Sequence, residues 1–465
     1  METCLTLSAR ALVTHYRDRT LSPRDVAAAL VAHIERCEPK IRALYGYDPD
    51  GLMREAAIAE RRWMDAAPSG PLDGVPVTVK ELIATRGMPV PKGTCVTPLV
   101  PAAQDAPPAA RLRESGALIY AKTTCPDYGM LSSGLSTFHA LSRNPWNLAC
   151  NPGGSSAGAG AAAAAGFGPL HLGTDIGGSV RLPAAWCGVV GFKPTLGRIP
   201  IDPYYVGRCA GPMTRTVEDA ALMMSVLAQD DRRDAMRLPP ESIDWSDLDT
   251  SLRGLKVGVL ADAGCGLPLD EEIRSALDAT AAAMRDAGAE CVALPAVMTR
   301  EMLDGLDRFW RARQWAELET LSPADRQRVL PYIVEWARTA TQLSGVDAVR
   351  GFEQTLKMRA ATEAVFDRVD IVLSPTTPNV AFPAQAASPT DDPTRPFEHI
   401  AYTVPWNMGE QPAISLPAGF SCDGMPIGVQ LIGPRFADRR VLAVARAVES
   451  ILALPARFPQ LTLEG

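Results

Sequence analysis

Short apolar stretches alternate with longer amphipathic stretches along most of the chain. Every second residue from Val75 to Val79 is a valine, which predicts a buried strand that ends at Lys80. A helical pattern over 106–115 and an apolar stretch over 117–123 follow, and the alternation resumes after residue 255. This order of strand, helix and strand predicts an α/β fold.

Residues 1–70 predict a helical N-terminal layer. Ser22 and Pro23 are typical of the first turn of a helix, which we expect to end at Pro39. A second helix is expected over 52–66.

The C-terminal half changes character twice. Residues 229–251 are charged and interrupted by prolines, and therefore predict a surface loop, whereas residues 300–367 predict helices throughout. A strand over 370–378, a strand pair over 412–433 and a last helix over 439–452 complete the pattern.

Residues 151–183 contain two Gly-Gly-Ser turns separated by an alanine-rich segment, 156–165, which predicts a closely packed helix. The serines of the turns are Ser155 and Ser179. Each follows two residues without a side chain, so its hydroxyl is accessible and backbone N–H groups can approach a ligand. A flexible linker would explain the same composition, so the interpretation depends on the rest of the chain.

Composition excludes several classes of function. The 465 residues are 47% hydrophobic, and 46 basic against 53 acidic side chains leave a net charge of −7. This balance argues against nucleic acid or an anionic membrane as the main partner.

We expect no membrane span and no secretory signal, and the ten cysteines without a CxxC pair indicate reduced thiols in a cytoplasmic protein. The five histidines show no metal-binding spacing, so we expect neither a metal nor another cofactor.

Several motifs together resemble the amidase signature family of serine hydrolases. They are VPVTVKE, AKTTCPDYGM, SRNPWNLACNPGGSSAG, GTDIGGSVRLPAAWCGVVGFKPTLGRI, GPMTRTVEDA, DIVLSPTTP and WNMGEQPAISLPAGFSCDGMPIGVQLIG. The resemblance implies one domain over residues 1–465, an amidase signature fold with a central mixed β-sheet flanked by helices. Within it, residues 71–225 would form the catalytic core and residues 300–367 a variable helical lid.

The same resemblance implies a Ser–Ser–Lys triad. Ser179 matches the nucleophile, Ser155 the bridging serine and Lys80 the base, with a cis peptide bond between Gly154 and Ser155. A serine hydroxyl needs a positioned base, and lysine serves as one only when it is neutral. Because a free lysine has a pKa of about 10.4, we expect burial to lower the pKa of Lys80.

The resemblance further assigns the residues around the nucleophile. The backbone N–H groups of Ile176, Gly177 and Gly178, with that of Ser179 as a further candidate, would form the oxyanion hole. Supporting positions are implied for four residues, for which capping or ion pairing is an equally good explanation: Ser156, Thr174, Asp175 and Arg181.

Two other functions fit parts of the sequence. Residues 158–163 satisfy the dinucleotide-binding pattern G-x-G-x-x-A, but prolines rather than a strand precede them. The glutaminase-type amidase subunit of a tRNA-dependent amidotransferase shares the motifs of the resemblance, and it works inside a complex. That branch usually carries a segment like G-x-E-x-K-R-R-I, which residues 345–362 lack.

The sequence says least about the substrate. Tyr128 and Met130 are expected to line the pocket, and the aromatic residues of 300–367 favour an apolar substrate, although such residues more often belong to a core. We expect hydrolysis of a small neutral carboxamide, with anilides, carbamates and esters as alternatives, through an acyl-enzyme on Ser179. The only expected partner is this small molecule, without nucleic acid or membrane, and a homodimer is left open.

Overall fold

The computed structural model describes residues 2–454 and 459, and its framework is a mixed β-sheet. The eleven strands lie in the order β1-β3-β2-β4-β6-β5-β10-β11-β9-β7-β8. They are β1 Leu44–Tyr45, β2 Pro76–Lys80, β3 Leu118–Thr123, β4 Leu170–Asp175, β5 Val190–Lys193, β6 Cys209–Thr214, β7 Lys256–Val259, β8 Glu290–Ala293, β9 Ile371–Pro375, β10 Ala413–Phe420 and β11 Pro426–Ile432. β2 is parallel to β3 and β4, and β7 is parallel to β8 and β9, whereas the remaining pairs are antiparallel.

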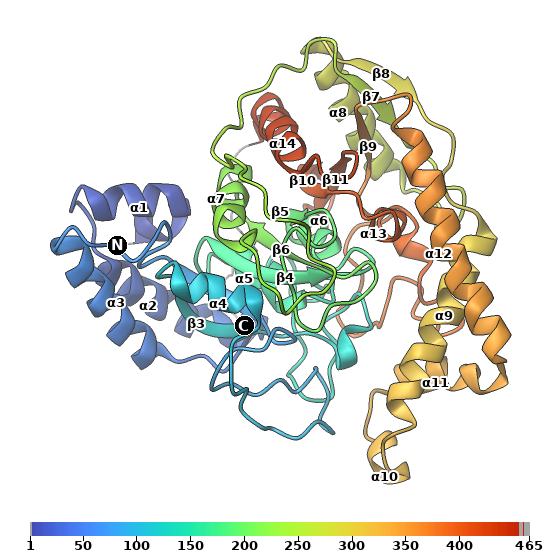
Figure 1. The fold of residues 1–465 in the computed structure, drawn as a ribbon, viewed down its shortest axis with the longest axis horizontal. Coiled ribbons are helices and arrows are strands. Elements are labelled where there is room, and N and C mark those ends of the chain that lie inside the picture. Colours follow the sequence, from blue (N-terminus) through green and yellow to red (C-terminus); the bar gives the residue numbers. More distant parts are fainter. Residues whose placement is uncertain (1, 455–458, 460–465) are drawn as a thin grey trace.

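Helices flank the sheet, with α1–α3 at one end of the molecule and α9–α12 at the other (Figure 1). The α-helices are α1 Ala9–Arg17, α2 Pro23–Ile41, α3 Pro49–Met64, α4 Pro107–Glu114, α5 Ala157–Ala164, α6 Arg181–Cys187, α7 Val217–Leu227, α8 Glu271–Asp286, α9 Arg300–Leu318, α10 Pro323–Arg326, α11 Pro331–Arg338, α12 Gly345–Val365, α13 Pro405–Met408 and α14 Asp438–Leu452. Among the described helices, none has the length and apolarity that crossing a membrane requires.

The core lies on both faces of the sheet, as alternation along β9 illustrates. Ile371 and Leu373 pack in one cluster with residues of α7, α8 and α14. Val372, between them, packs in a second cluster with residues of α9, α12 and α13. Successive side chains of a strand point to opposite faces, so one strand joins the two clusters. The predicted single α/β domain with a mixed sheet flanked by helices is thereby confirmed.

The N-terminal helices form where the sequence predicts them, with different ends. Ser22 caps α2, but the helix continues past Pro39, so the expectation that this proline ends it is wrong. Near the C-terminal end a proline removes one helical hydrogen bond only, and the helix ends at Ile41, followed by Arg42 as a cap with a left-handed backbone. α3 begins at Pro49, three residues earlier than expected, because the Asp48 side chain caps it.

Three elements after the second glycine turn escape the sequence pattern: α6, β5 and β6. All residues of β5 and β6 are buried, so their sequences show no alternation of apolar and polar positions. Gly211 and Pro212 within β6 also weaken a strand prediction. Residues 229–251 contain no helix or strand in the described structure, as the loop prediction states.

Helix α5 is buried along its whole length. A Cβ atom at Gly158 would lie 2.2 Å from the carbonyl oxygen of Ala43 and 2.4 Å from the backbone nitrogen of Thr124. The backbone of α5 therefore packs directly against the backbone of two other segments. No space remains there for a pyrophosphate, which argues against dinucleotide binding at this glycine.

This packing predicts the effect of one methyl group. Gly158→Ala forces the backbone of Ala43 or Thr124 to move, and we expect it to lower the free energy of unfolding by about 3 kcal/mol. A methyl group added at Gly345, at the start of α12, would meet no heavy atom within 4 Å, so Gly345→Ala is a matched control with an expected change of about 0.5 kcal/mol or less. Denaturant unfolding measures both variants, and similar losses in the two would contradict the packing argument.

Candidate active site

Two parallel neighbours in the sheet bring the predicted catalytic groups together. Lys80 is the last residue of β2, and Asp175 is the last residue of β4. Because β2 and β4 pair in parallel, both residues lie at the same edge of the sheet. The turn that carries Ser179 begins directly after Asp175, so it forms at this edge beside Lys80.

The amine of Lys80 is enclosed by hydroxyl groups. Its Nζ lies within hydrogen-bond distance of Ser155 Oγ at 2.8 Å, Thr174 Oγ1 at 3.0 Å and Ser156 Oγ at 3.1 Å. The whole side chain is buried. Ser156 Oγ in turn donates to the carbonyl oxygen of Thr174 at 3.1 Å. The geometry thus brings Lys80 together with Ser155 and with two of the predicted supporting residues.

Burial lowers the pKa of Lys80 to about 8. Four charged or titratable groups also act on this amine. Arg208 lowers its pKa further, whereas Cys125, Asp175 and Glu81 oppose the shift. Desolvation is the largest of these effects, so the neutral amine is far more accessible here than in a lysine exposed to water.

No hydrogen bond joins the hydroxyl groups of Ser155 and Ser179 in the described structure. The peptide bond between Gly154 and Ser155 is cis. The N–H of Ser156 donates to the carbonyl oxygen of Ser179 at 3.3 Å, which ties the two glycine turns together. A proton transfer between the hydroxyls requires them to come within hydrogen-bond distance, and catalytic hydrogen bonds often tighten only when substrate is bound.

Asp175 fixes the turn of the nucleophile. Its carboxylate accepts hydrogen bonds from the N–H groups of Gly178 at 2.8 Å and Val180 at 3.1 Å. It also pairs with Arg181, with both side chains buried. Burial acts to raise the pKa of Asp175, but Arg181 and further donors overcome this effect and hold the pKa below its usual range. The carboxylate is therefore charged, and its hydrogen bonds to backbone N–H groups fix the turn.

These bonds correct one expectation about the oxyanion hole. The N–H of Gly178 is used by Asp175, so it is not available to a reacting carbonyl oxygen. For the N–H groups of Ile176, Gly177 and Ser179, no acceptor is present within the described part of the chain. Three accessible donors remain in the turn, one of them Ser179 itself.

Sequence reasoning missed the residues that hold Arg181. Its guanidinium donates to Gln430 Oε1 at 3.0 Å, to the carbonyl oxygen of Thr403 at 3.1 Å and to Asn407 Oδ1 at 2.6 Å. Asn407 also donates to Asp175 Oδ1 at 2.8 Å. Asn407 and Gln430 lie in the C-terminal motif, more than 200 residues from Arg181, so only the folded sheet reveals the contact.

Ser179 opens into a small pocket of about 30 Å³, lined mainly by apolar side chains. The lining residues are Gly129, Met130, Leu131, Ser132, Ile176, Gly177, Ser179, Leu182, Trp310, Arg313, Phe397 and Ile400. Met130 lines the pocket as the sequence suggests. Tyr128 does not, which corrects that expectation: its N–H donates to the carbonyl oxygen of Lys92, and its backbone is left-handed with φ of 54°.

Of the aromatic residues in 300–367, Trp310 lines this pocket. Most of the other aromatic residues of this segment pack in or against the apolar cluster between the helices. Trp336 is buried and donates to Asp307, and Trp315 lies beneath the guanidinium of Arg326. Most of these rings are therefore core, which was the alternative interpretation.

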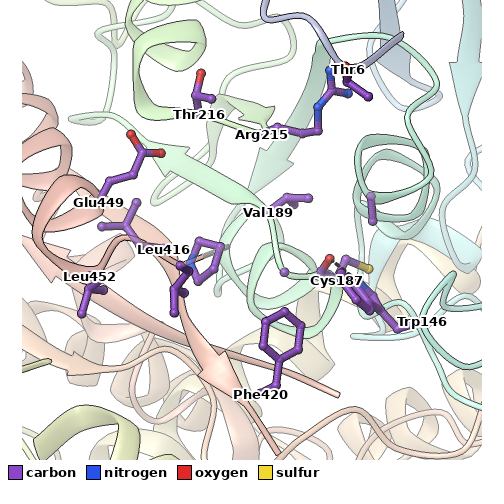
Figure 2. Close-up of a pocket in the computed structure, with 14 residues that line it drawn as sticks. Thr6, Trp146, Cys187, Val189, Arg215, Thr216, Leu416, Phe420, Glu449 and Leu452 are labelled. Carbon is purple, nitrogen blue, oxygen red and sulfur yellow. Dashed lines mark hydrogen bonds between the residues drawn. The ribbon is translucent and has the colours of Figure 1, made fainter. Parts of the chain in front are cut away.

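A larger cavity of about 240 Å³ lies elsewhere, between the end of β10, the end of α14 and the start of α7 (Figure 2). Figure 2 shows Arg215 and Glu449 on its wall with the apolar Leu416 and Phe420. The guanidinium of Arg215 donates to three backbone carbonyls, and Glu449 accepts from a backbone N–H. These polar groups already support the fold, whereas the pocket at Ser179 contains the reactive ones.

Metal ligands do not gather anywhere in the described residues, because they contain no group of three or more His, Cys, Asp or Glu able to hold an ion. All ten cysteines are free thiols, with only Cys422 exposed. The chemistry of the site therefore has to be argued from hydroxyls, one amine and backbone N–H groups.

Comparison with known proteins identifies the family of this chain. Residues 25–442 match the family model described as Amidase. The chain is 34% identical to a subunit of the glutamyl-tRNA(Gln) amidotransferase of Roseiflexus sp. (strain RS-1), over 95% of both chains. It is 33% identical to an acylamidase of Rhodococcus erythropolis over 96% of this chain and 95% of that one.

Solved structures show the same fold. A bacterial aryl acylamidase of the amidase signature family superimposes with a TM-score of 0.87 and 30% identity, with 96% of each chain covered. A 6-aminohexanoate cyclic dimer hydrolase gives a TM-score of 0.89 and 29% identity over 98% of this chain and 99% of that one. Family model and fold agree, and the chain belongs to the amidase signature family of hydrolases, which act on amide C–N bonds.

Proposed function

We propose that this protein hydrolyses small carboxamides to a carboxylic acid and an amine or ammonia, through an acyl-enzyme on Ser179. Anilides, carbamates and esters of similar shape are further candidates. The observation that carries the proposal is the buried amine of Lys80, 2.8 Å from Ser155 Oγ and next to the turn of Ser179. Family membership supports the reaction class.

The hydrogen bonds of Lys80 fit a neutral amine. Such an amine has two N–H donors and one lone pair. The Ser156 hydroxyl donates to a backbone carbonyl, so it accepts one N–H from Lys80, and Thr174 Oγ1 lies within reach of the other. The lone pair then faces the Ser155 hydroxyl, which passes on the proton of Ser179 as Ser179 attacks the substrate. The same path returns a proton to the leaving amine.

Backbone N–H groups stabilise the oxyanion in this mechanism. We assign this role to Ile176, Gly177 and Ser179, because Gly178 is bonded to Asp175. The carbonyl of Gly177 accepts from Thr403 Oγ1 at 2.6 Å, which fixes the orientation of the turn. A donor of this kind typically contributes about 3 kcal/mol to transition-state stabilisation.

The lining of the pocket favours an apolar group next to the reacting carbonyl. Leu182, Trp310 and Ile400 surround Ser179, and a Cβ atom at Gly177 would lie 3.1 Å from Trp310.

A second candidate function is the glutaminase subunit of a tRNA-dependent amidotransferase. The sequence identity of 34% to such a subunit over nearly the whole chain favours it. The segment 345–362 in α12 lacks the G-x-E-x-K-R-R-I pattern usual in that branch, which favours an enzyme acting alone.

The nucleophile can be tested by covalent labelling. A serine-reactive fluorophosphonate should add once to the wild-type protein, at Ser179, and intact-mass measurement with peptide mapping locates the adduct. Ser179→Ala should lose both the adduct and amide hydrolysis, by a factor of about 10³ or more, as expected for residues acting as a unit. An adduct on another serine, or normal turnover by Ser179→Ala, would refute the proposed nucleophile.

The pH profile tests the base. The folded-state pKa of Lys80 is about 8, below its ordinary value of 10.5, so the amine is mostly protonated at pH 6 and mostly neutral at pH 9. We expect kcat/KM for a neutral anilide to rise about tenfold per pH unit below this pKa and to level off above pH 9. A stopped assay from pH 5.5 to 10 measures it. A profile flat over this range, or one that falls, would contradict Lys80 as the base.

A substrate comparison separates the two candidate functions. We expect kcat/KM for acetanilide to exceed that for free glutamine by at least tenfold, because most side chains that line the pocket are apolar and the charged one, Arg313, repels the ammonium group of glutamine. Glutamine hydrolysis at least tenfold faster, or activity that appears only with partner subunits, would favour the amidotransferase function. Tenfold corresponds to about 1.4 kcal/mol.

A further inference from the structure

The pocket that contains Ser179 is also lined by a positively charged side chain, Arg313 of α9. Arg313 follows Trp310 by three residues, so both lie on the same face of the helix. The guanidinium carbon of Arg313 lies 4.0 Å from the centre of the Tyr205 ring. This cation–π contact orients the guanidinium without neutralising its charge.

A second arginine belongs to the same region. The N–H of Arg208 donates to the carbonyl oxygen of Tyr205 at 3.0 Å, and its guanidinium donates to the carbonyl oxygen of Pro203 at 2.8 Å. Burial lowers the pKa of Arg208 to about 10, and the charge of Arg313 acts in the same direction. Arg208 also acts on the pKa of Lys80. Arg208 is therefore electrostatically close both to Arg313 and to the catalytic amine.

Neither guanidinium has an acidic partner. Across residues 2–454, no carboxylate lies within 4.0 Å of Arg313 or Arg208, although nearby Lys92 pairs with Glu317. Asp202 stabilises the charge of Arg208 only from a greater distance. Two like charges close together at a partly buried position repel each other, and an anion placed between them removes this cost.

We propose that Arg313 and Arg208 bind a carboxylate of the amide substrate. The inference deepens the proposed amide hydrolysis and rests on it. The substrate then has three parts: a reacting carbonyl at Ser179, an apolar part against Trp310, and a carboxylate at the two guanidinium groups. A guanidinium fits a carboxylate with two parallel hydrogen bonds, and two such groups set both the charge and the direction of the substrate.

Arg181, the cation closest to Ser179 in sequence, cannot play this part. Its side chain is wholly buried, and it is fully engaged with Asp175, Asn407 and Gln430. Arg313, by contrast, is exposed at the pocket. Arg181 is therefore paired with a buried carboxylate, whereas Arg313 and Arg208 have no carboxylate partner among residues 2–454.

Matched pairs of anilides test the proposal and show on which side of the scissile bond the carboxylate lies. Succinanilate carries a carboxylate on the acyl side, and butyranilide is its neutral counterpart. 4-Acetamidobenzoate carries a carboxylate on the amine side, and 4-methylacetanilide is its neutral counterpart. We expect kcat/KM of the wild type to favour the charged member of one pair by at least tenfold.

Two variants connect this preference to the arginines. Arg313→Met and Arg208→Met keep an unbranched side chain but remove the charge, and each should reduce the ratio of charged to neutral kcat/KM by at least tenfold. Arg308→Met is the control, because Arg308 lies on α9 outside the pocket lining and its loss should leave the ratio unchanged. A wild type that prefers the neutral member of both pairs, or a ratio unaltered in Arg313→Met, overturns the proposal.

A binding measurement keeps this test independent of catalysis. In the Ser179→Ala background, calorimetry should show tighter binding of one charged anilide than of its neutral counterpart, and Arg313→Met should remove the difference. Equal binding of both members of each pair contradicts the carboxylate site even if neutral anilides are hydrolysed, in which case amide hydrolysis stands. A charged anilide that binds but is not hydrolysed by the wild type would instead refute the proposed reaction.

Discussion

The burial of one amine organises this structure. Lys80 ends a strand that is buried throughout, and its Nζ is surrounded by three hydroxyls rather than by water. Hydroxyls satisfy a neutral amine with hydrogen bonds but do not replace the solvation of a full charge, which is why burial lowers the pKa to about 8. The surrounding elements have to be rigid enough to exclude water from this amine. The buried helix α5, whose backbone packs directly on two neighbouring segments, supplies part of that rigidity.

A buried ion pair beside the amine, Asp175 with Arg181, holds the turn of the nucleophile in place. Asp175 holds the turn of Ser179 by backbone N–H bonds, and a buried carboxylate with this role needs a fixed counter-charge. Arg181 provides it, and Asn407 and Gln430 satisfy the remaining donors and acceptors from the C-terminal motif. The sheet therefore connects the two halves of the chain at the point where the nucleophile is presented. This explains why the C-terminal motif is part of the same site without containing a reacting group.

Local sequence predicts the strand that ends at Lys80 and the two glycine turns. Alternating valines before Lys80 indicate a buried strand, and glycines before Ser155 and Ser179 indicate close backbone approach, so the strand and the turns follow from neighbours in sequence, whereas the candidate triad is what the resemblance to the amidase signature family implies. The hydrogen bond of Gly178 could not be predicted from the sequence. Its N–H donates to the Asp175 side chain, whose position depends on the folded turn. Tyr128 has a left-handed backbone that the sequence does not indicate, and it is not among the residues that line the pocket, whereas Met130 is. Buried strands without alternation, β5 and β6, carry too little pattern to be recognised.

The arginines show why substrate specificity is harder to predict from sequence than the catalytic groups are. Arg181 lies within a motif, and its partners are fixed by the same sheet that positions the nucleophile. Arg208 and Arg313 come from a loop and from α9, far apart in the sequence, and each contacts Tyr205, Arg313 through the ring and Arg208 through the backbone carbonyl. Whether a charge is compensated depends on every acidic group around it, which only the fold determines. A sequence rich in aromatic residues over 300–367 thus indicates an apolar cover, whereas the structure adds that this cover also carries a positive charge beside the proposed nucleophile.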